Sequence, residues 1–351
     1  MTEAEGVEDD EAKGPRREWP LPEADRPQPA GPEPEPIRVG VSACLLGRNV
    51  RYDGGHKEYR FLTRELARYV EFVPVCPEVE VGMPTPRPTI RLVRDDEAPG
   101  GQRLVCPSTG EDHSEAMRAF AEARVADLRE QGLCGYVLKA SSPSCGMERV
   151  RLYDRDMPSR TGVGMFAQVL LAEWPELPVE EEGRLHDPFL RETFLEAVFA
   201  TARLRELFRG AWKTKDLVAF HTAEKLSLLA HDPEAYRELG RLVARQAELP
   251  RDELQATYSR RFLLAFRQPA SRGRHVNVLQ HMLGYFKDTL PSELRHEVLD
   301  LVEDFRAGLV PLAVPLTLLR HHVRAQGVAY LAGQTYLDPA PKRLKLRSVV
   351  I

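Results

Sequence analysis

Three cysteines stand far apart in the sequence, each beside small or turn-forming residues. They are Cys44 in SACLLG, Cys76 in VCPEVE and Cys145 in SSPSCG, at separations of 32 and 69 residues. No pair has the short C-x-x-C spacing of a local metal-binding knuckle. The three thiols can therefore act together only if the fold brings three distant segments to one place. The other two cysteines, Cys106 and Cys134, lack this setting and are expected to be buried apolar residues.

Three thiolates can support more than one kind of centre. They are one ligand short of a closed structural zinc site, which His56 could complete. They also suit a [4Fe–4S] cluster, for which four cysteines are the usual ligands. With only three, one iron is left open to bind a soft atom such as sulfur. The residues alone leave both centres open, together with a redox sensor built on the same thiols.

Polar residues beside two of the cysteines could take part in catalysis. Glu78 lies two residues after Cys76, where its carboxylate could accept a proton from water. Ser142 lies three residues before Cys145, in the turn that Pro143 and a following glycine shape. A helix-start carboxylate and a turn-capping hydroxyl are the structural alternatives for the two residues.

Three further polar residues could contact a substrate. Asp53 lies in RYDGG, where its carboxylate could accept a hydrogen bond from a ring N–H; otherwise this segment is a surface turn. Ser144 adjoins Cys145. Lys139 stands at the end of the preceding strand, where its ammonium group could stabilise negative charge.

The sequence around the cysteines alternates between strand and helix patterns. Strand patterns occur at 37–41, 71–76 and 135–139, and helical patterns at 61–70, 114–132 and 165–174. This alternation predicts an α/β fold with a doubly wound, Rossmann-like parallel sheet. In such sheets ligands bind beyond the carboxyl ends of the strands. Because Cys44, Cys76 and Cys145 each lie past a strand end, we expect their thiols to converge at one edge of the sheet.

From about residue 188 the strand patterns cease and amphipathic helices follow one another. The sequence thus predicts four parts: a disordered, acidic, proline-rich tail at 1–36, the α/β domain at 37–185, a linking helix at 186–212 and an all-α domain at 213–351. The chemistry-bearing motifs all precede residue 150, so we expect the all-α domain to be dispensable for the reaction.

Composition and charge narrow the class of protein. No run of 18 apolar residues is present, which predicts no membrane span, and five cysteines are too few and too odd in number for a secreted disulfide framework. A cytoplasmic setting is expected. Residues 213–351 contain 21 Lys/Arg and 15 Asp/Glu, a net charge of +6, with clusters at Arg260–Arg261 and 272–275. This mild excess permits RNA contact but does not require it.

Three segments resemble the motifs of a known family, the TudS-like thiouracil desulfidases. They are VSACLLGRNVRYDGG, FVPVCPEVEVGMPTPRP and LKASSPSCG, within residues 37–180. The resemblance implies a [4Fe–4S] cluster held by Cys44, Cys76 and Cys145, whose open iron binds the thiocarbonyl sulfur of the substrate. It also implies that Glu78 and Ser142 are the catalytic residues and that water replaces the sulfur.

Residues 213–347 resemble a second family, the YbgA-like domain. The match lies in HVNVLQHMLGYFK, VPLTLLRHH and YLAGQTYLDPAPKRLKLR. The usual FHxxHKYxLLAH motif reads FHTAEKLSLLAH here, so Glu224 replaces a histidine and Leu226 a tyrosine. The resemblance does not define a role for this domain.

The sequence therefore predicts an iron–sulfur-dependent desulfidase that acts on a thiolated pyrimidine of the 4-thiouridine or thiouracil type and releases sulfide. The substrate could be a base, a nucleoside, a nucleotide or a tRNA, with RNA contact through the basic all-α domain. The alternative is a zinc or iron–sulfur module that contacts RNA or senses redox state without catalysis.

Overall fold

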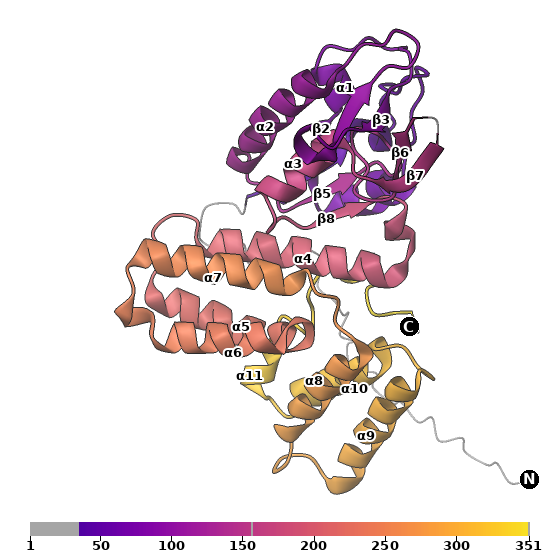
Figure 1. Cartoon of the computed structure of the whole chain (residues 1–351). Helices are drawn as coiled ribbons and strands as arrows, with labels where there is room; N and C mark the ends of the chain where they lie inside the picture. The colour runs from indigo at the N-terminus through magenta and orange to yellow at the C-terminus, as the bar shows by residue number, and fades with distance from the viewer. Residues whose placement is uncertain (1–34, 156, 350–351) are drawn as a thin grey trace, which may run out of the picture. The chain divides into compact units, whose positions relative to one another are not determined.

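A four-stranded parallel sheet forms the centre of the first domain in the computed structural model, which describes residues 35–155 and 157–349 (Figure 1). The strands stand in the order β2-β1-β5-β8, and each neighbouring pair is parallel. Their bounds are Arg38–Ser42 for β1, Glu71–Val75 for β2, Gly135–Leu138 for β5 and Val179–Glu181 for β8. The predicted α/β class is confirmed. The tail predicted at 1–36 lies outside the described residues except for its last two.

Helices cover both faces of this sheet. On one face the buried strand residues pack against α2 (Ser114–Glu130) and α3 (Met165–Glu173). On the other face they pack against α4 (Pro188–Leu207) and two single turns, η3 (Phe61–Glu65) and η4 (Leu66–Arg68). β1 and β5 are buried along nearly their whole length and have apolar sequences, as expected of strands covered on both faces. β2 lies at the edge of the sheet, and only its last residue, Val75, is fully buried.

A second four-stranded sheet, which was not predicted from the sequence, belongs to the same domain. Its order is β4-β3-β6-β7, with β3 parallel to β6 and the other two pairs antiparallel. The bounds are Arg91–Arg94 for β3, Gln102–Val105 for β4, Val150–Asp154 for β6 and Met157–Gly162 for β7. These strands are short and polar, and β7 is exposed along its first five residues. β6 alternates apolar Val150 and Leu152 with an exposed arginine, but only over a few residues, which is too short a run to identify a strand from the sequence.

The helix α4, predicted as a linker at 186–212, contributes to the cores of both domains. It begins after Asp187, whose carboxylate accepts a hydrogen bond from the backbone N–H of Phe189 (2.8 Å). Phe194 packs in the apolar cluster beside the sheet, whereas Leu204 packs among the helices that follow. The two domains therefore share a buried helix.

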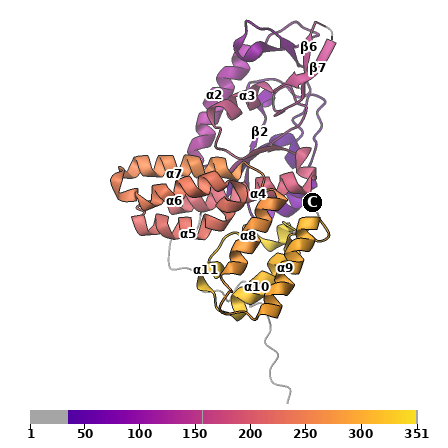
Figure 2. The same ribbon diagram turned by 60° about the horizontal axis from the view of Figure 1, so that its bottom comes forward.

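The helices after α4 form the all-α domain that the sequence predicts (Figure 2). Their bounds are Thr214–His231 for α5, Pro233–Ala244 for α6, Arg251–Phe266 for α7, Arg272–Gly284 for α8, Ser292–Ala307 for α9, Ala313–Ala325 for α10 and Ala329–Ala332 for α11. One apolar core lies among α4 to α7 and another mainly among α8 to α11. Within 35–155 and 157–349, no helix combines the length and apolar character needed to cross a bilayer.

The last described residues of the chain return to the first domain. Ala340, Leu344 and Leu346 pack in the same apolar cluster as Val41 and Leu45 beside the sheet. The all-α domain thus completes part of the core of the α/β domain. Its expected dispensability is not supported by this packing, because a chain ending near residue 210 would expose that cluster.

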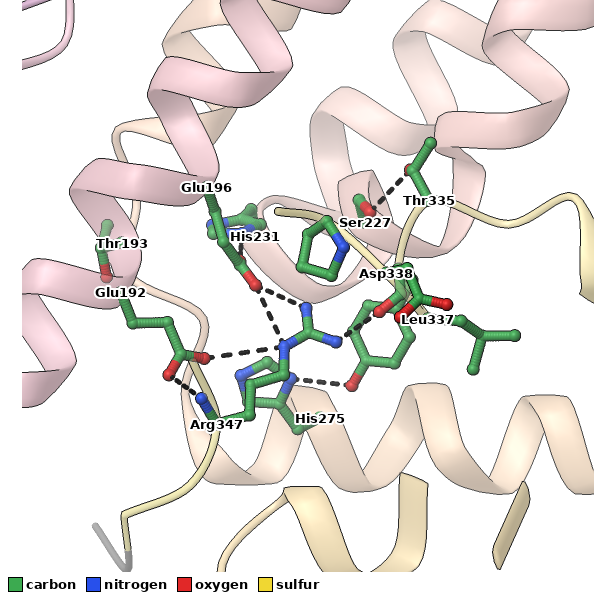
Figure 3. Close-up of polar contacts among 12 residues, drawn as sticks. Glu192, Thr193, Glu196, Ser227, His231, His275, Thr335, Leu337, Asp338 and Arg347 are labelled. Carbon is green, nitrogen blue, oxygen red and sulfur yellow. Dashed lines mark hydrogen bonds and ion pairs between the residues drawn. The ribbon is translucent and has the colours of Figure 1, made fainter. Parts of the chain in front are cut away.

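Arg347 anchors this returning segment in a buried group of charges (Figure 3). Its guanidinium donates to Glu196 Oε1 through Nε (3.0 Å) and Nη2 (2.5 Å), and its backbone N–H donates to Glu192 Oε2 (2.7 Å). Both ring nitrogens of His231 have polar contacts: Nε2 lies 2.8 Å from the other oxygen of Glu196, and Nδ1 lies 2.7 Å from the carbonyl oxygen of Gln268. Charges buried this deeply persist only when they are paired.

The two carboxylates of this group depend on pH in opposite ways. Burial, and then the neighbouring Glu196, raise the pKa of Glu192 from 4.5 to about 7. The stability that Glu192 contributes is thus fully present below its unfolded pKa and is lost as pH rises through its folded pKa. Burial opposes ionisation of Glu196, but Arg347 and His231 hold its pKa well below its usual range. The contribution of Glu196 is therefore lost on acidification.

Burial lowers the pKa of His221 to about 4 and that of His275 to about 3, so the stability that these two histidines contribute rises with pH up to about 6.5 and opposes the change at Glu192. The contribution of Glu192 is therefore measured as a difference between two proteins.

We predict that, relative to the unchanged protein, Glu192→Gln gains free energy of unfolding between pH 5 and pH 7, because the amide does not titrate. Urea unfolding of both proteins at these two pH values measures the effect. Glu293→Gln, at an exposed glutamate of α9, is the matched control and should show no such gain. An equal difference between Glu192→Gln and the unchanged protein at both pH values would contradict the prediction.

Candidate active site

The three cysteines that follow strand ends line one cavity of about 380 Å³. Cys44, Cys76 and Cys145 all line it, together with residues of the loops that follow β1, β2 and β5. These three strands are neighbours in the parallel sheet, so the cavity lies at their carboxyl ends. Its volume is within the range of small-molecule sites, about 300–1,000 Å³. Cys106 and Cys134 are buried and do not line it.

Two neighbouring strand ends place Cys44 and Cys76. After β1 the chain enters a 3₁₀ turn, η2 (Ala43–Leu46), which contains Cys44. After β2, Cys76 caps the N-terminus of a one-turn helix, α1 (Pro77–Glu80). The last residues of β1 and β2 are register partners, so the two cysteines leave the sheet at the same level.

The N-terminus of α3 holds the turn that contains Cys145. The backbone N–H groups of Met165 and Phe166 donate to the carbonyl oxygens of Pro143 (3.0 Å) and Ser144 (3.0 Å). Free N–H groups at a helix start are available for such contacts. The turn is thereby attached to a buried helix, which fixes the position of the thiol.

Backbone geometry restricts the same turn further. Ser141 has a φ of 61°, a left-handed conformation that is uncommon outside glycine. At Gly146 a Cβ atom would lie 2.9 Å from the carbonyl oxygen of Ser142, so a larger residue does not fit. Glu181 of β8 accepts the N–H of Met147 (2.6 Å). Strain of this kind persists where surrounding contacts over-determine it, commonly at functional sites.

Burial raises the pKa of the three thiols in the cavity. The pKa of Cys44 rises to about 11, that of Cys145 rises well above its ordinary value, and that of Cys76 also rises. Cys44 and Cys76 each add to the rise at Cys145, so the three thiols are close enough to influence one another. Lys139 and Arg51 oppose the rise at Cys44.

Glu78 lines the cavity with both of its oxygens engaged. Oε2 accepts hydrogen bonds from Arg87 through Nε (2.9 Å) and Nη2, and Oε1 accepts one from the Ser144 hydroxyl (2.9 Å). The side chain of Arg87 is 3% exposed and that of Glu78 is 14% exposed. The carboxylate is therefore fixed in a largely buried wall with a small opening to the cavity.

Ser142 and Lys139 also line the cavity. The Ser142 oxygen accepts the backbone N–H groups of Ser144 (3.2 Å) and Cys145 (3.1 Å). Both acceptor positions of the hydroxyl are then used, which leaves its O–H as a donor. The ammonium group of Lys139 forms an ion pair with Glu182, so its charge is already balanced.

Two of the expected substrate-binding residues have other contacts and are not part of the cavity wall. Asp53 is exposed; its Oδ1 accepts the N–H of Gly55 (3.0 Å) and pairs with Arg51 (3.4 Å). Its carboxylate therefore stabilises the turn, which was the alternative considered for RYDGG. Ser144 is fully buried, and its hydroxyl holds Glu78 rather than facing a substrate.

Three residues that support the site were not predicted from the sequence: Arg87, which lies within the second cysteine motif, and Glu181 and Glu182, which lie outside the three motifs. Arg87 lies in the proline-rich segment PTPRPT, which has no periodic pattern. One feature of the sequence could have identified Arg87 as a site residue: it is a single cation between two prolines, in a segment that resembles the family. Glu182 accepts the N–H of Ala140 (2.6 Å), a contact across 42 residues that no local pattern indicates.

Two family models match the chain in succession. Residues 39–182 match 2-thiouracil desulfurase, and residues 225–341 match a protein family of unknown function, DUF1722. The chain is therefore a member of the 2-thiouracil desulfurase family that also carries a DUF1722 domain.

Three related proteins can be compared with this chain. It is 31% identical to the uncharacterized protein YbgA of Escherichia coli (strain K12) over 157 residues, 44% of this chain and 93% of YbgA. It is 32% identical to the uncharacterized protein YbbK of Bacillus subtilis (strain 168) over 108 residues, 30% of this chain and 71% of YbbK. The solved [4Fe–4S]-dependent thiouracil desulfidase TudS is 32% identical, with 43% of this chain and 93% of TudS covered and a TM-score of 0.35. The resemblance to both families is confirmed by the sequence matches, to which this superposition adds nothing.

Proposed function

We propose that this protein is a desulfidase that replaces the sulfur of a thiolated pyrimidine with oxygen, using a [4Fe–4S] cluster held by Cys44, Cys76 and Cys145. One observation carries the proposal: thiols from three distant segments line a single cavity together with Glu78. Membership of the 2-thiouracil desulfurase family supports the class of reaction. The [4Fe–4S] dependence of TudS, a relative at 32% identity, supports the cofactor.

The donor set of the cavity fits a cluster better than a single zinc ion. Zinc needs four ligands at about 2.0–2.3 Å from one point. Among the described residues that line the cavity, the metal-binding side chains are the three thiols and Glu78, whose oxygens are engaged by Arg87 and Ser144. His56, considered above as a fourth ligand, is exposed and accepts the N–H of Glu58 (3.2 Å). The cysteines of a cluster bind different irons and so stand further apart than the ligands of one ion.

The same thiols are poorly suited to redox sensing on their own. Redox-sensing cysteines are accessible and have a lowered pKa. Cys44 and Cys145 are only 8% and 6% exposed, and burial raises the pKa of both. Iron binding would instead deprotonate the thiols, because thiolates are the form that binds metal. These properties favour the cluster over the sensor.

When bound, the cluster would supply an open iron that can take the sulfur of the substrate. Side chains of this protein accept the proton that the attacking water loses. Glu78 Oε2 already accepts two hydrogen bonds and Oε1 accepts one, which leaves one acceptor position on Oε1. That position is suited to a water molecule, whose oxygen the Ser142 O–H can orient.

The reaction balances without an added oxidant or reductant. Glu78 accepts a proton from water, the water oxygen bonds to the pyrimidine carbon, and the carbon–sulfur bond breaks. Water supplies one oxygen and two protons, so a thiocarbonyl and water give a carbonyl and hydrogen sulfide. Lys139 also lines the cavity, but its ammonium group is already paired with Glu182 and is assigned no step in the reaction.

We infer that the substrate is 4-thiouridine or a related nucleoside or nucleotide. The basic clusters of the all-α domain were the candidate surface for RNA contact, but most of these cations are engaged. Arg261 pairs with two carboxylates, Arg274 donates to a backbone carbonyl (2.5 Å), and His275 is buried. Comparing base, nucleoside, nucleotide and thiolated tRNA as substrates of the reconstituted protein tests this inference; a preference for tRNA would contradict it.

We predict that Glu78→Gln keeps the cluster but lowers turnover about 10²–10⁴-fold, the usual contribution of a general base. Sulfide release from 4-thiouridine measures turnover, and iron content shows whether the cluster is present. Glu122→Gln, at an exposed position of α2, is the matched control and should be fully active. Turnover of Glu78→Gln within a few-fold of the unchanged protein would make Glu78 a structural residue.

A further inference from the structure

Arg87 is a buried cation whose every donor is used. Its Nε and Nη2 donate to Glu78, Nη2 also donates to the carbonyl of Val50 (3.0 Å), and Nη1 donates to the Pro84 carbonyl (3.2 Å) and the Thr85 hydroxyl (3.2 Å). A guanidinium has five N–H groups, and these contacts occupy all five. Its side chain is 3% exposed. The group is therefore fixed in position and has no donor left for a substrate.

The partners of Arg87 belong to three segments that meet at the cavity. The carbonyl of Val50 that it binds is also faced by the Cys76 thiol (3.8 Å). The backbone N–H of Arg87 donates to the carbonyl of Tyr52 (2.9 Å), and Tyr52 lines the cavity. One guanidinium thus joins the loop after η2, the start of α1 and the segment around residue 85.

This arrangement decides which part of the Glu78 carboxylate is available. Arg87 occupies both acceptor positions of Oε2, and the Ser144 hydroxyl occupies one of the two on Oε1. Because Arg87 binds one oxygen of the carboxylate and Ser144 binds the other, the carboxylate cannot rotate without breaking one of these contacts. A single acceptor position, on Oε1, is left.

We propose that Arg87 is a positioning residue for desulfidation, acting through Glu78. It keeps the carboxylate oriented so that only Oε1 can accept a proton from water. This inference rests on the proposed function, in which Glu78 is the proton acceptor. It assigns to Arg87 no contact with the substrate and no role in holding the cluster.

The planar fork of arginine explains why this residue type is needed. Arginine can bind one carboxylate oxygen with two parallel N–H groups, whereas lysine offers a point charge without that geometry. Arg87→Lys should therefore restore the charge and part of the orientation. Arg87→Met removes both while keeping an unbranched apolar side chain in the buried space.

The test uses the full-length, cluster-reconstituted protein with 4-thiouridine as the probe. Arg87→Met should lower kcat about 10²-fold, the effect of a small misplacement of a reacting group, with KM, substrate Kd and iron content unchanged. Arg87→Lys should lie between Arg87→Met and the unchanged protein. Arg48→Met, at an exposed arginine of the same domain, is the control and should be fully active.

A double-mutant cycle supplies the decisive readout. If Arg87 acts through Glu78, the double variant Glu78→Gln/Arg87→Met loses no more turnover than Glu78→Gln alone. Additive losses would overturn the proposal, as would a raised KM with unchanged kcat, or loss of iron or of folding in both Arg87 variants. Full turnover by Glu78→Gln would instead refute the proposed role of Glu78 itself, so the two failures are distinguishable.

Discussion

Serine in place of Cys44, Cys76 or Cys145 is expected to abolish both iron binding and desulfidation. All three thiols line one cavity, and each is proposed to hold one iron of the same cluster. Serine has nearly the same size but offers a hard oxygen, which binds cluster iron far more weakly than a thiolate does. Iron and acid-labile sulfide content, the brown colour of anaerobically purified protein and sulfide release from 4-thiouridine measure the effect.

Cys106→Ser and Cys134→Ser are the matched controls, because both cysteines are buried but lie outside the cavity. Each should retain iron and activity. Full iron content in Cys44→Ser, Cys76→Ser or Cys145→Ser would remove that cysteine from the ligand set. Loss of iron in the controls would mean that iron content reports general unfolding.

Arg347→Met is expected to lower the free energy of unfolding by about 3–5 kcal/mol, the usual cost of leaving buried charge without its partner. Arg347 and Glu196 are 5% and 3% exposed, and Glu192 shares the same guanidinium. Removing the cation leaves two carboxylates close together with less compensation. It also releases the segment that packs beside the sheet. Urea unfolding of the full-length chain measures the effect.

Arg343→Met provides the control, since Arg343 is an exposed arginine of the same segment. Its free energy of unfolding should change little. Adding Glu192→Gln and Glu196→Gln to Arg347→Met should recover part of the loss, because the uncompensated charge is gone. An Arg347→Met protein as stable as the unchanged chain would show that the buried charges do not depend on this arginine.

Much of the first domain could be predicted because its central strands carry local patterns. β1, β2 and β5 are apolar runs followed by turn-forming residues, so their strand ends and the cysteines beyond them were visible in the sequence. The parallel order then placed those ends at one edge of the sheet. The structure has all three cysteines lining one cavity, while their role as cluster ligands stays a prediction.

The rest depends on contacts between residues far apart in the chain. Ser144 was expected to bind substrate, but its hydroxyl meets Glu78 across 66 residues. The bond between Arg347 and Glu196 spans 151 residues. No periodicity marks either pairing, because each is decided by how the packed elements meet. The role of α4 could not be predicted for the same reason. Its sequence has the pattern of an ordinary amphipathic helix, which does not show that it packs in the cores of two domains.

The stoichiometry of the reaction distinguishes a cluster-dependent desulfidase from a protein that only binds iron. Anaerobically reconstituted protein should be incubated with 4-thiouridine, and uridine and sulfide should be quantified together with bound iron. We expect one sulfide for each uridine over many turnovers, without an added oxidant or reductant, and no turnover by the iron-free protein. Iron-loaded protein that converts no thiolated base, nucleoside, nucleotide or tRNA, or iron-free protein that is equally active, would contradict this expectation.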